Sequence, residues 1–117
     1  MRYSLIPWIA LAALFGLSLP LSADTTPANE ACSVKSRSDA VVIVVCEPGV
    51  SEQGLREAGR AACGDNAQCN AWIWDDSAAA PATAPARDAD LPKDRSGAAV
   101  AVWVNDTGSL LTIKRMR

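Results

Sequence analysis

The chain has 117 residues, half of them hydrophobic, with 13 acidic residues, 11 basic residues and no histidine, for a formal charge of −2. Without histidine, Ser-His-Asp and Cys-His catalytic sets are excluded within a single chain. Charges of both signs are interspersed, which argues against nucleic-acid binding, since that binding depends on concentrated positive charge. The one basic run, residues 114–117, is interpreted as a solvated terminus.

Residues 1–23 have the pattern of a secretory signal peptide. Arg2 is followed by an uncharged apolar stretch from Leu5 to Leu21, and Ala23 precedes a switch to polar sequence. This pattern predicts export, with cleavage near Ala23 and a secreted or periplasmic mature chain of 94 residues (117 − 23). An uncleaved membrane anchor is the alternative, because the stretch lies at the lower edge of the length that crosses a bilayer. In that case this segment alone would contact the membrane.

The mature chain has the size of one small domain, which buries too little surface to be very stable without help. All four cysteines lie in this part, namely Cys32, Cys46, Cys63 and Cys69. An even number of cysteines in an exported protein predicts disulfides rather than a metal site, and four cysteines allow three pairings. We expect no metal ion and no cofactor.

Residues 24–39 are interpreted as a lead-in to a single domain that spans residues 40–117. This domain opens with a continuous β-branched run at 40–46, which is typical of a central strand covered on both faces. A helix is predicted to follow, with Ser51 as its N-cap and Gly64 as its stop signal.

The predicted helix has an apolar stripe at the spacing of one helix face, formed by Leu55, Ala58 and Ala62. Gly54 and Gly59 lower its intrinsic stability, which indicates close packing against a sheet. Residues 70–76 then predict a short strand, so that strand, helix and strand form a βαβ unit with parallel strands.

Residues 77–90 are rich in alanine and proline and predict a flexible surface loop. Residues 99–114 predict a β-hairpin, with Gly108 at the left-handed position of its turn. The predicted fold is therefore α+β, a small βαβ unit plus a C-terminal β-hairpin forming one mixed sheet, with a single helix packed on it and two disulfides.

The parallel assignment chooses among the cysteine pairings. Cys46 would lie at the end of the sheet where the helix begins, while Cys63 and Cys69 would lie at the other end, about 20 Å away and too far for a disulfide. Cys63 is therefore expected to pair with Cys69, and Cys32 with Cys46 if residues 33–35 fold back along the first strand. These pairings require the two strands to be parallel.

The order of these elements resembles that of small domains of unknown function in exported bacterial proteins. The matching segments are residues 44–55, 72–76 and 98–105, and the resemblance covers residues 40–114. It implies a compact α+β fold and no assigned activity, and the four cysteines set this chain apart.

Acidic residues at strand ends are one candidate site. Asp75 and Asp76 end one predicted strand and Glu47 follows another, at the carboxyl ends where open α/β sheets place their sites. Paired acids could serve glycoside hydrolysis or calcium binding, whereas the simpler interpretation makes them solvated strand ends.

Aromatic residues are the other candidate. Trp72 and Trp74 share one face of their strand, and with Trp103 they could form a platform for a sugar or a peptide. The simpler interpretation places these rings in the core, because each buries a large apolar area. Likewise, the sequon that begins at Asn105 is a glycosylation acceptor only in a suitable eukaryotic route, and its plainer role is the hairpin turn.

We therefore expect a disulfide-stabilised binding or interaction module of the cell envelope or extracellular space, with an unknown protein or glycan partner. Its candidate binding residues are Trp72, Trp74, Asp75 and Asp76. The alternative is a small acid-based hydrolase that uses the strand-end carboxylates. The binding module is favoured because the sequence has no recognisable catalytic motif and no catalytic residue can be assigned.

Overall fold

The computed structural model describes residues 27–29 and 31–113, so the expected signal peptide and its cleavage site lie outside the described residues. Six strands form one sheet in chain order. They are β1 (Pro27–Asn29), β2 (Cys32–Arg37), β3 (Val41–Cys46), β4 (Asn70–Trp74), β5 (Ala101–Val104) and β6 (Ser109–Thr112). The pair β3 and β4 is parallel and the other neighbouring pairs are antiparallel. The α+β prediction is confirmed, including the parallel pair on which the cysteine argument depended.

Strand β2 lies within the segment interpreted from the sequence as a lead-in. Residues 32–37 form a strand of the sheet and pair antiparallel with β3, which is the fold-back that the pairing of Cys32 with Cys46 requires. Cys32 lies directly opposite Cys46, and the two form a disulfide with their Cα atoms 3.9 Å apart. The fold-back expected for residues 33–35 is therefore longer than the sequence indicates, because the polar residues of β2 give no continuous strand pattern.

Helix α1 (Glu52–Cys63) forms the crossover between β3 and β4, as predicted. Its N-cap is Ser51, whose Oγ accepts a hydrogen bond from the backbone N–H of Gly54 at 3.1 Å. Its C-cap is Gly64, whose φ of 59° is strained for residues with a side chain. The predicted apolar stripe is buried against the sheet.

The second disulfide joins the end of α1 to the start of β4. Cys63 and Cys69 have Cα atoms 5.6 Å apart and close the short loop between them. Both predicted pairings are therefore confirmed. The C-terminal hairpin of β5 and β6 is also confirmed, and Gly108 adopts the expected left-handed conformation with a φ of 68°.

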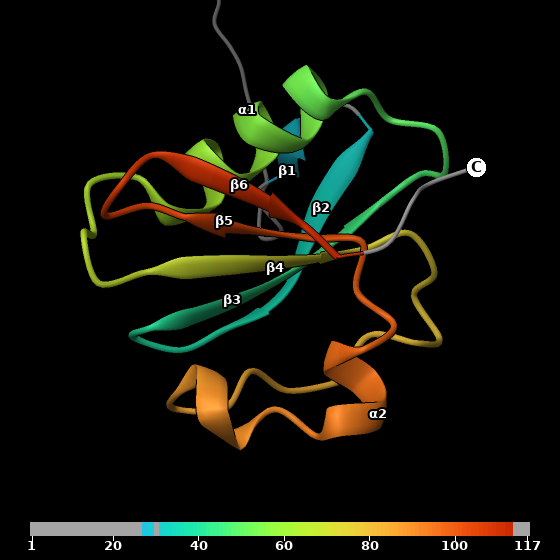
Figure 1. Cartoon of the computed structure of the whole chain (residues 1–117), viewed down its shortest axis with the longest axis vertical. Helices are drawn as coiled ribbons and strands as arrows, with labels where there is room; N and C mark the ends of the chain where they lie inside the picture. Colours follow the sequence, from blue (N-terminus) through green and yellow to red (C-terminus); the bar gives the residue numbers. More distant parts are fainter. Residues whose placement is uncertain (1–26, 30, 114–117) are drawn as a thin grey trace, which may run out of the picture.

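The sheet has a core on each face. Helix α1 covers one face, where Val42, Val44 and Ile73 are buried. Residues 77–99, here named the covering segment, lie on the other face, where Ile43 and Trp74 are buried. Figure 1 shows α1 and the orange part of this segment on opposite sides of the sheet.

The covering segment contains two short helical turns, η1 (Asp88–Asp90) and α2 (Lys93–Ser96). Composition predicted a flexible surface loop over most of it, yet Ala80, Ala84 and Leu91 are buried against the sheet. Small alanine side chains let the backbone approach the sheet closely, and this contact has no helical or strand period that a sequence pattern would reveal.

Polar side chains of β2 and its turn hold the covering segment in place. Lys35 donates hydrogen bonds from Nζ to the carbonyls of Ser77 and Ala80, at 2.7 and 3.1 Å. Ser36 Oγ accepts from the backbone N–H of Ala84 at 2.7 Å. The pairing register of β2 shifts between Val34 and Ser36, so this bulge lets consecutive side chains reach the same face.

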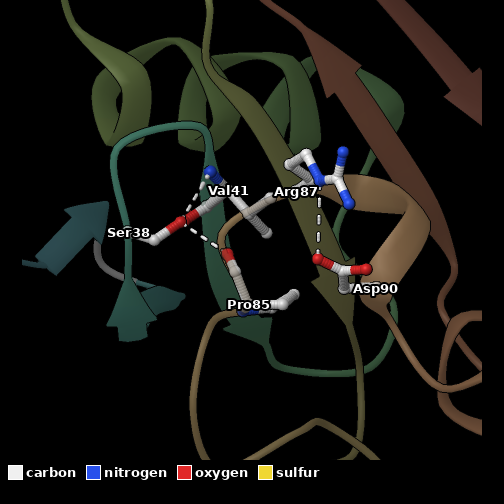
Figure 2. Close-up of polar contacts among 5 residues, drawn as sticks. All are labelled: Ser38, Val41, Pro85, Arg87 and Asp90. Atoms are coloured by element: carbon white, nitrogen blue, oxygen red, sulfur yellow. Dashed lines mark hydrogen bonds and ion pairs between the residues drawn. The ribbon is translucent and has the colours of Figure 1, made fainter.

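A further tie lies at the turn between β2 and β3 (Figure 2). Ser38 Oγ donates to the carbonyl of Pro85 at 2.6 Å and accepts from the backbone N–H of Val41 at 3.1 Å. Arg87 and Asp90, also drawn there, form an exposed ion pair with Nε and Oδ2 3.6 Å apart. The serine therefore joins the sheet to the segment, while the ion pair lies within the segment itself.

Candidate functional site

The tryptophans of β4 lie beneath the covering segment. Trp72 and Trp74 share one face of the strand, as predicted, with ring centroids 6.4 Å apart and planes inclined by 29°. Trp74 is fully buried, and its Nε1 donates to the carbonyl of Arg95 at 2.9 Å. Trp72 is half-buried. Trp74 is therefore a core residue of the second face, and the partly buried Trp72 packs against that core rather than forming an open aromatic platform.

Asp88 ties this aromatic pair to the covering segment. Its Oδ1 accepts from Nε1 of Trp72 at 2.6 Å, and its Oδ2 accepts from Nδ2 of Asn70 at 2.8 Å. Both carboxylate oxygens are thereby used within the fold. Sequence reasoning missed this residue, because an acid in an alanine- and proline-rich segment gives no signal of its partner.

The strand-end acids lie at one end of the sheet, as the parallel assignment predicted. The paired register of β3 and β4 ends with Val45 opposite Trp74. Glu47 and Asp75 therefore follow the carboxyl ends of two adjacent parallel strands and lie at the same end of the sheet. Asp76 is exposed, and its Oδ1 accepts from the backbone N–H of Ala78 at 2.9 Å. This bond gives Asp76 a turn-forming role. Across residues 27–29 and 31–113, no group of three acidic or cysteine residues is placed to hold a metal ion.

Trp103 lies on the face covered by α1. Its ring is buried between β5 and the helix, and the guanidinium carbon of Arg60 lies 5.2 Å from the ring centroid. A β-carbon added at Gly59 would meet Trp103 at 2.3 Å. The predicted close packing of a helix glycine on the sheet is therefore confirmed, and Trp103 belongs to the core.

Asn105 connects the hairpin turn to the loop closed by the second disulfide. Its Nδ2 donates to the carbonyls of Gly64 and Asn66 at 3.0 and 2.9 Å, while its Oδ1 accepts from Nε1 of Trp103 at 2.8 Å. A glycan attached to Nδ2 would replace one of its two hydrogens and so remove at least one of these two donated bonds. The sequon is therefore used by the fold itself, beyond the turn that the sequence predicted.

Strand β6 is an open edge of the sheet, since it pairs with β5 on one side and ends the strand order. Leu111 within β6 and Ile113 just after it are 55% and 42% exposed, and they are the large hydrophobic residues that the described chain leaves exposed. Both lie on the face opposite α1, because the register places Leu110 opposite the buried Trp103.

The backbone of β6 also offers hydrogen-bonding groups at this edge. The N–H of Ile113 donates to the carbonyl of Val100 at 2.8 Å. Since backbone groups alternate in direction along a strand, this bond shows that the odd-numbered residues of β6 direct their N–H and C=O groups toward β5. Antiparallel pairing then turns the N–H and C=O groups of Leu110 and Thr112 away from β5. Edge strands of monomeric proteins are commonly protected by charged residues, proline or a bulge. Residues 109–113 are Ser-Leu-Leu-Thr-Ile and pair with β5 without a register shift, so this segment has no charge, proline or bulge and is protected by the short length of β6 alone, four residues.

No helix in the described part of the chain is long and apolar enough to span a membrane. Comparison with protein-family models, with curated proteins and with solved structures found no match to this chain.

Proposed function

We propose that this chain is a small exported interaction module that binds protein through the open edge of β6. The observation that carries the proposal is the exposure of Leu111 and Ile113 beside unpaired backbone groups of Leu110 and Thr112. An extended segment of another chain can add to such an edge, with backbone hydrogen bonds supplying affinity and side chains supplying specificity.

The two disulfides support the exported part of the proposal. Structural disulfides form and persist in oxidising compartments, where they stabilise domains too small to have a large core. Export with cleavage near Ala23 is the route by which this chain would reach such a compartment.

A protein partner is favoured over a glycan because of the tryptophans. Aromatic sugar binding needs an exposed ring face, whereas Trp74 and Trp103 are 0% and 2% exposed. Trp72 is half-buried, and its Nε1 is already bonded to Asp88. Strand addition needs no aromatic platform and uses the surface that the described fold leaves apolar. The candidate residues Trp72, Trp74, Asp75 and Asp76 are accordingly replaced by the β6 edge as the proposed contact surface.

The proposal is tested by placing a photo-crosslinking amino acid at position 111 in the living cells that export the protein. A matched control carries the same group at Ala86, an exposed position in the covering segment. We expect a protein adduct from position 111 and none from position 86. Absence of any adduct from position 111 would refute the proposed function.

The acid-based hydrolase is the second candidate, because Glu47 and Asp75 lie at the same end of the sheet, after the adjacent strands β3 and β4. It is separated from the interaction module by a variant that carries Glu47→Ala, Asp75→Ala and Asp76→Ala together. The interaction module predicts that this variant gives the same adduct from position 111 and the same cellular phenotype as the wild type. Loss of the phenotype with the adduct retained would favour the hydrolase.

A further inference from the structure

The chemistry of the β6 edge is self-complementary. Its outward backbone groups belong to Leu110 and Thr112, which lie on either side of Leu111. If two copies of β6 meet antiparallel with Leu111 on a two-fold axis, Leu110 of one copy lies opposite Thr112 of the other. Each outward N–H then has an outward C=O as its partner, so all outward groups of the strand are satisfied.

On this basis, and resting on the proposed function, we propose that the partner of β6 is β6 of a second copy of the chain. The contact is isologous, since the same residues are used on both sides, and it closes after two copies. Pairing of β6 with β1 at the opposite edge would instead be head-to-tail and leave an open edge at each end of the assembly.

The side chains agree with this register. Leu111 meets Leu111 of the second copy in a non-hydrogen-bonded pair, where Cα atoms are about 4.5 Å apart and side chains are closest. Ile113 lies on the same face, diagonal to this pair and opposite Ser109 of the second copy. The pairing therefore covers the two exposed aliphatic side chains with each other, and it opposes no charged residue to another within 109–113.

The sequence on the two sides of β6 is oppositely charged. Asp106 precedes the strand, and three of the four residues that follow Ile113 in the sequence are basic. Antiparallel pairing of two copies therefore brings unlike charges together at each end of the strand, whereas parallel pairing would bring like charges together, so charge favours the antiparallel arrangement.

Sedimentation equilibrium of the disulfide-bonded mature chain tests this inference with a charge-swap pair. The two-fold axis places residue 111 against itself, so Leu111→Lys alone and Leu111→Glu alone each bring like charges together. We expect the wild type to be dimeric, each variant alone to be monomeric, and an equimolar mixture of the two variants to be dimeric again. Ala86→Lys adds the same charge away from the edge and is expected to stay dimeric.

Thr112→Pro is a second variant that leaves the ladder to β5 intact, because the N–H of Thr112 points outward. We expect it to be monomeric with an unchanged far-ultraviolet circular dichroism spectrum. A monomeric wild type, or a dimer that survives both Leu111→Lys and Thr112→Pro, would overturn the inference. A monomeric wild type that still crosslinks to a different protein from position 111 would overturn the second copy as partner and leave the proposed function standing.

Discussion

Gly59 of α1 lies directly over Trp103 of β5, so close that an added β-carbon would be 2.3 Å from Cβ and 2.4 Å from Cγ of the tryptophan. The absence of a side chain at this position sets how near the helix can approach the sheet. Glycine at this position lowers the intrinsic stability of the helix by about 1 kcal/mol relative to alanine. The close approach that it permits buries Trp103, the largest side chain on the sheet face covered by α1.

Gly59→Ala should therefore destabilise the protein even though alanine is the better helix former. The clash involves Cβ and Cγ of Trp103, which side-chain rotation cannot move away from the helix. Overpacking of this kind costs about 1–3 kcal/mol. Gly54→Ala is the control, because its new β-carbon would meet Val50 Cγ1, the end of a side chain that can move. Urea denaturation of both variants measures the difference. A Gly59→Ala variant as stable as the wild type would contradict the packing described.

The two disulfides should contribute unequally to stability. The Cys32–Cys46 bridge spans 14 residues of sequence and the Cys63–Cys69 bridge spans 6. In the chain-entropy account, the longer loop is worth about 3 kcal/mol and the shorter about 2 kcal/mol. We expect the paired alanine variant of the first bridge to have the lower urea midpoint. Equal midpoints, or the reverse order, would show that loop length does not decide their contributions here.

Asp88→Asn should loosen the covering segment. Asparagine keeps one acceptor but presents an NH₂ group where Trp72 and Asn70 both donate, so one donor loses its partner at a cost of about 1–3 kcal/mol. Asp90→Asn is matched to it in charge, and it removes only an exposed ion pair worth about 0–1 kcal/mol. Thermal unfolding and tryptophan fluorescence report both variants. A red-shifted spectrum is expected for Asp88→Asn, and identical behaviour of the two would count against the tie.

Asn105→Asp should weaken the contact between the hairpin turn and the disulfide loop. The aspartate retains an acceptor for Trp103 but cannot donate to the carbonyls of Gly64 and Asn66. A loss of about 1–3 kcal/mol in the free energy of unfolding is expected. Asp65→Ala changes an exposed residue of the disulfide loop and should alter stability by no more than about 0.5 kcal/mol. If both variants unfold at the same denaturant concentration, the asparagine has no bridging role.

The architecture could be predicted where sequence signals are local. The β-branched run of β3, the N-cap Ser51 and the turn glycine Gly108 each have a mechanism that acts within a few residues. Both disulfides followed from these elements, because a parallel β3 and β4 separates Cys46 from the other pair by the length of a strand.

The second face of the sheet could not be predicted, because its contacts join residues distant in sequence. Lys35 binds carbonyls more than forty positions away, and neither it nor Ser36 has a pattern that marks a buried tie. The sequence correctly predicted that Trp72 and Trp74 share one face of β4, but it did not predict that residues 77–99 cover that face. For the same reason the exposure of Leu111 emerged only from the structure, since the hairpin pattern does not tell which face another element covers.

Amide hydrogen exchange at the β6 edge tests the central claim most directly, because Leu110 and Thr112 carry the N–H groups that a partner strand must bind. The measurement compares their exchange in concentrated and dilute samples of the disulfide-bonded mature chain, with Leu111 as the internal reference bonded to β5. We predict that Leu110 and Thr112 are protected at high concentration and lose protection on dilution, while Leu111 stays protected throughout. Rapid exchange of Leu110 and Thr112 at every concentration would contradict strand pairing between copies at this edge.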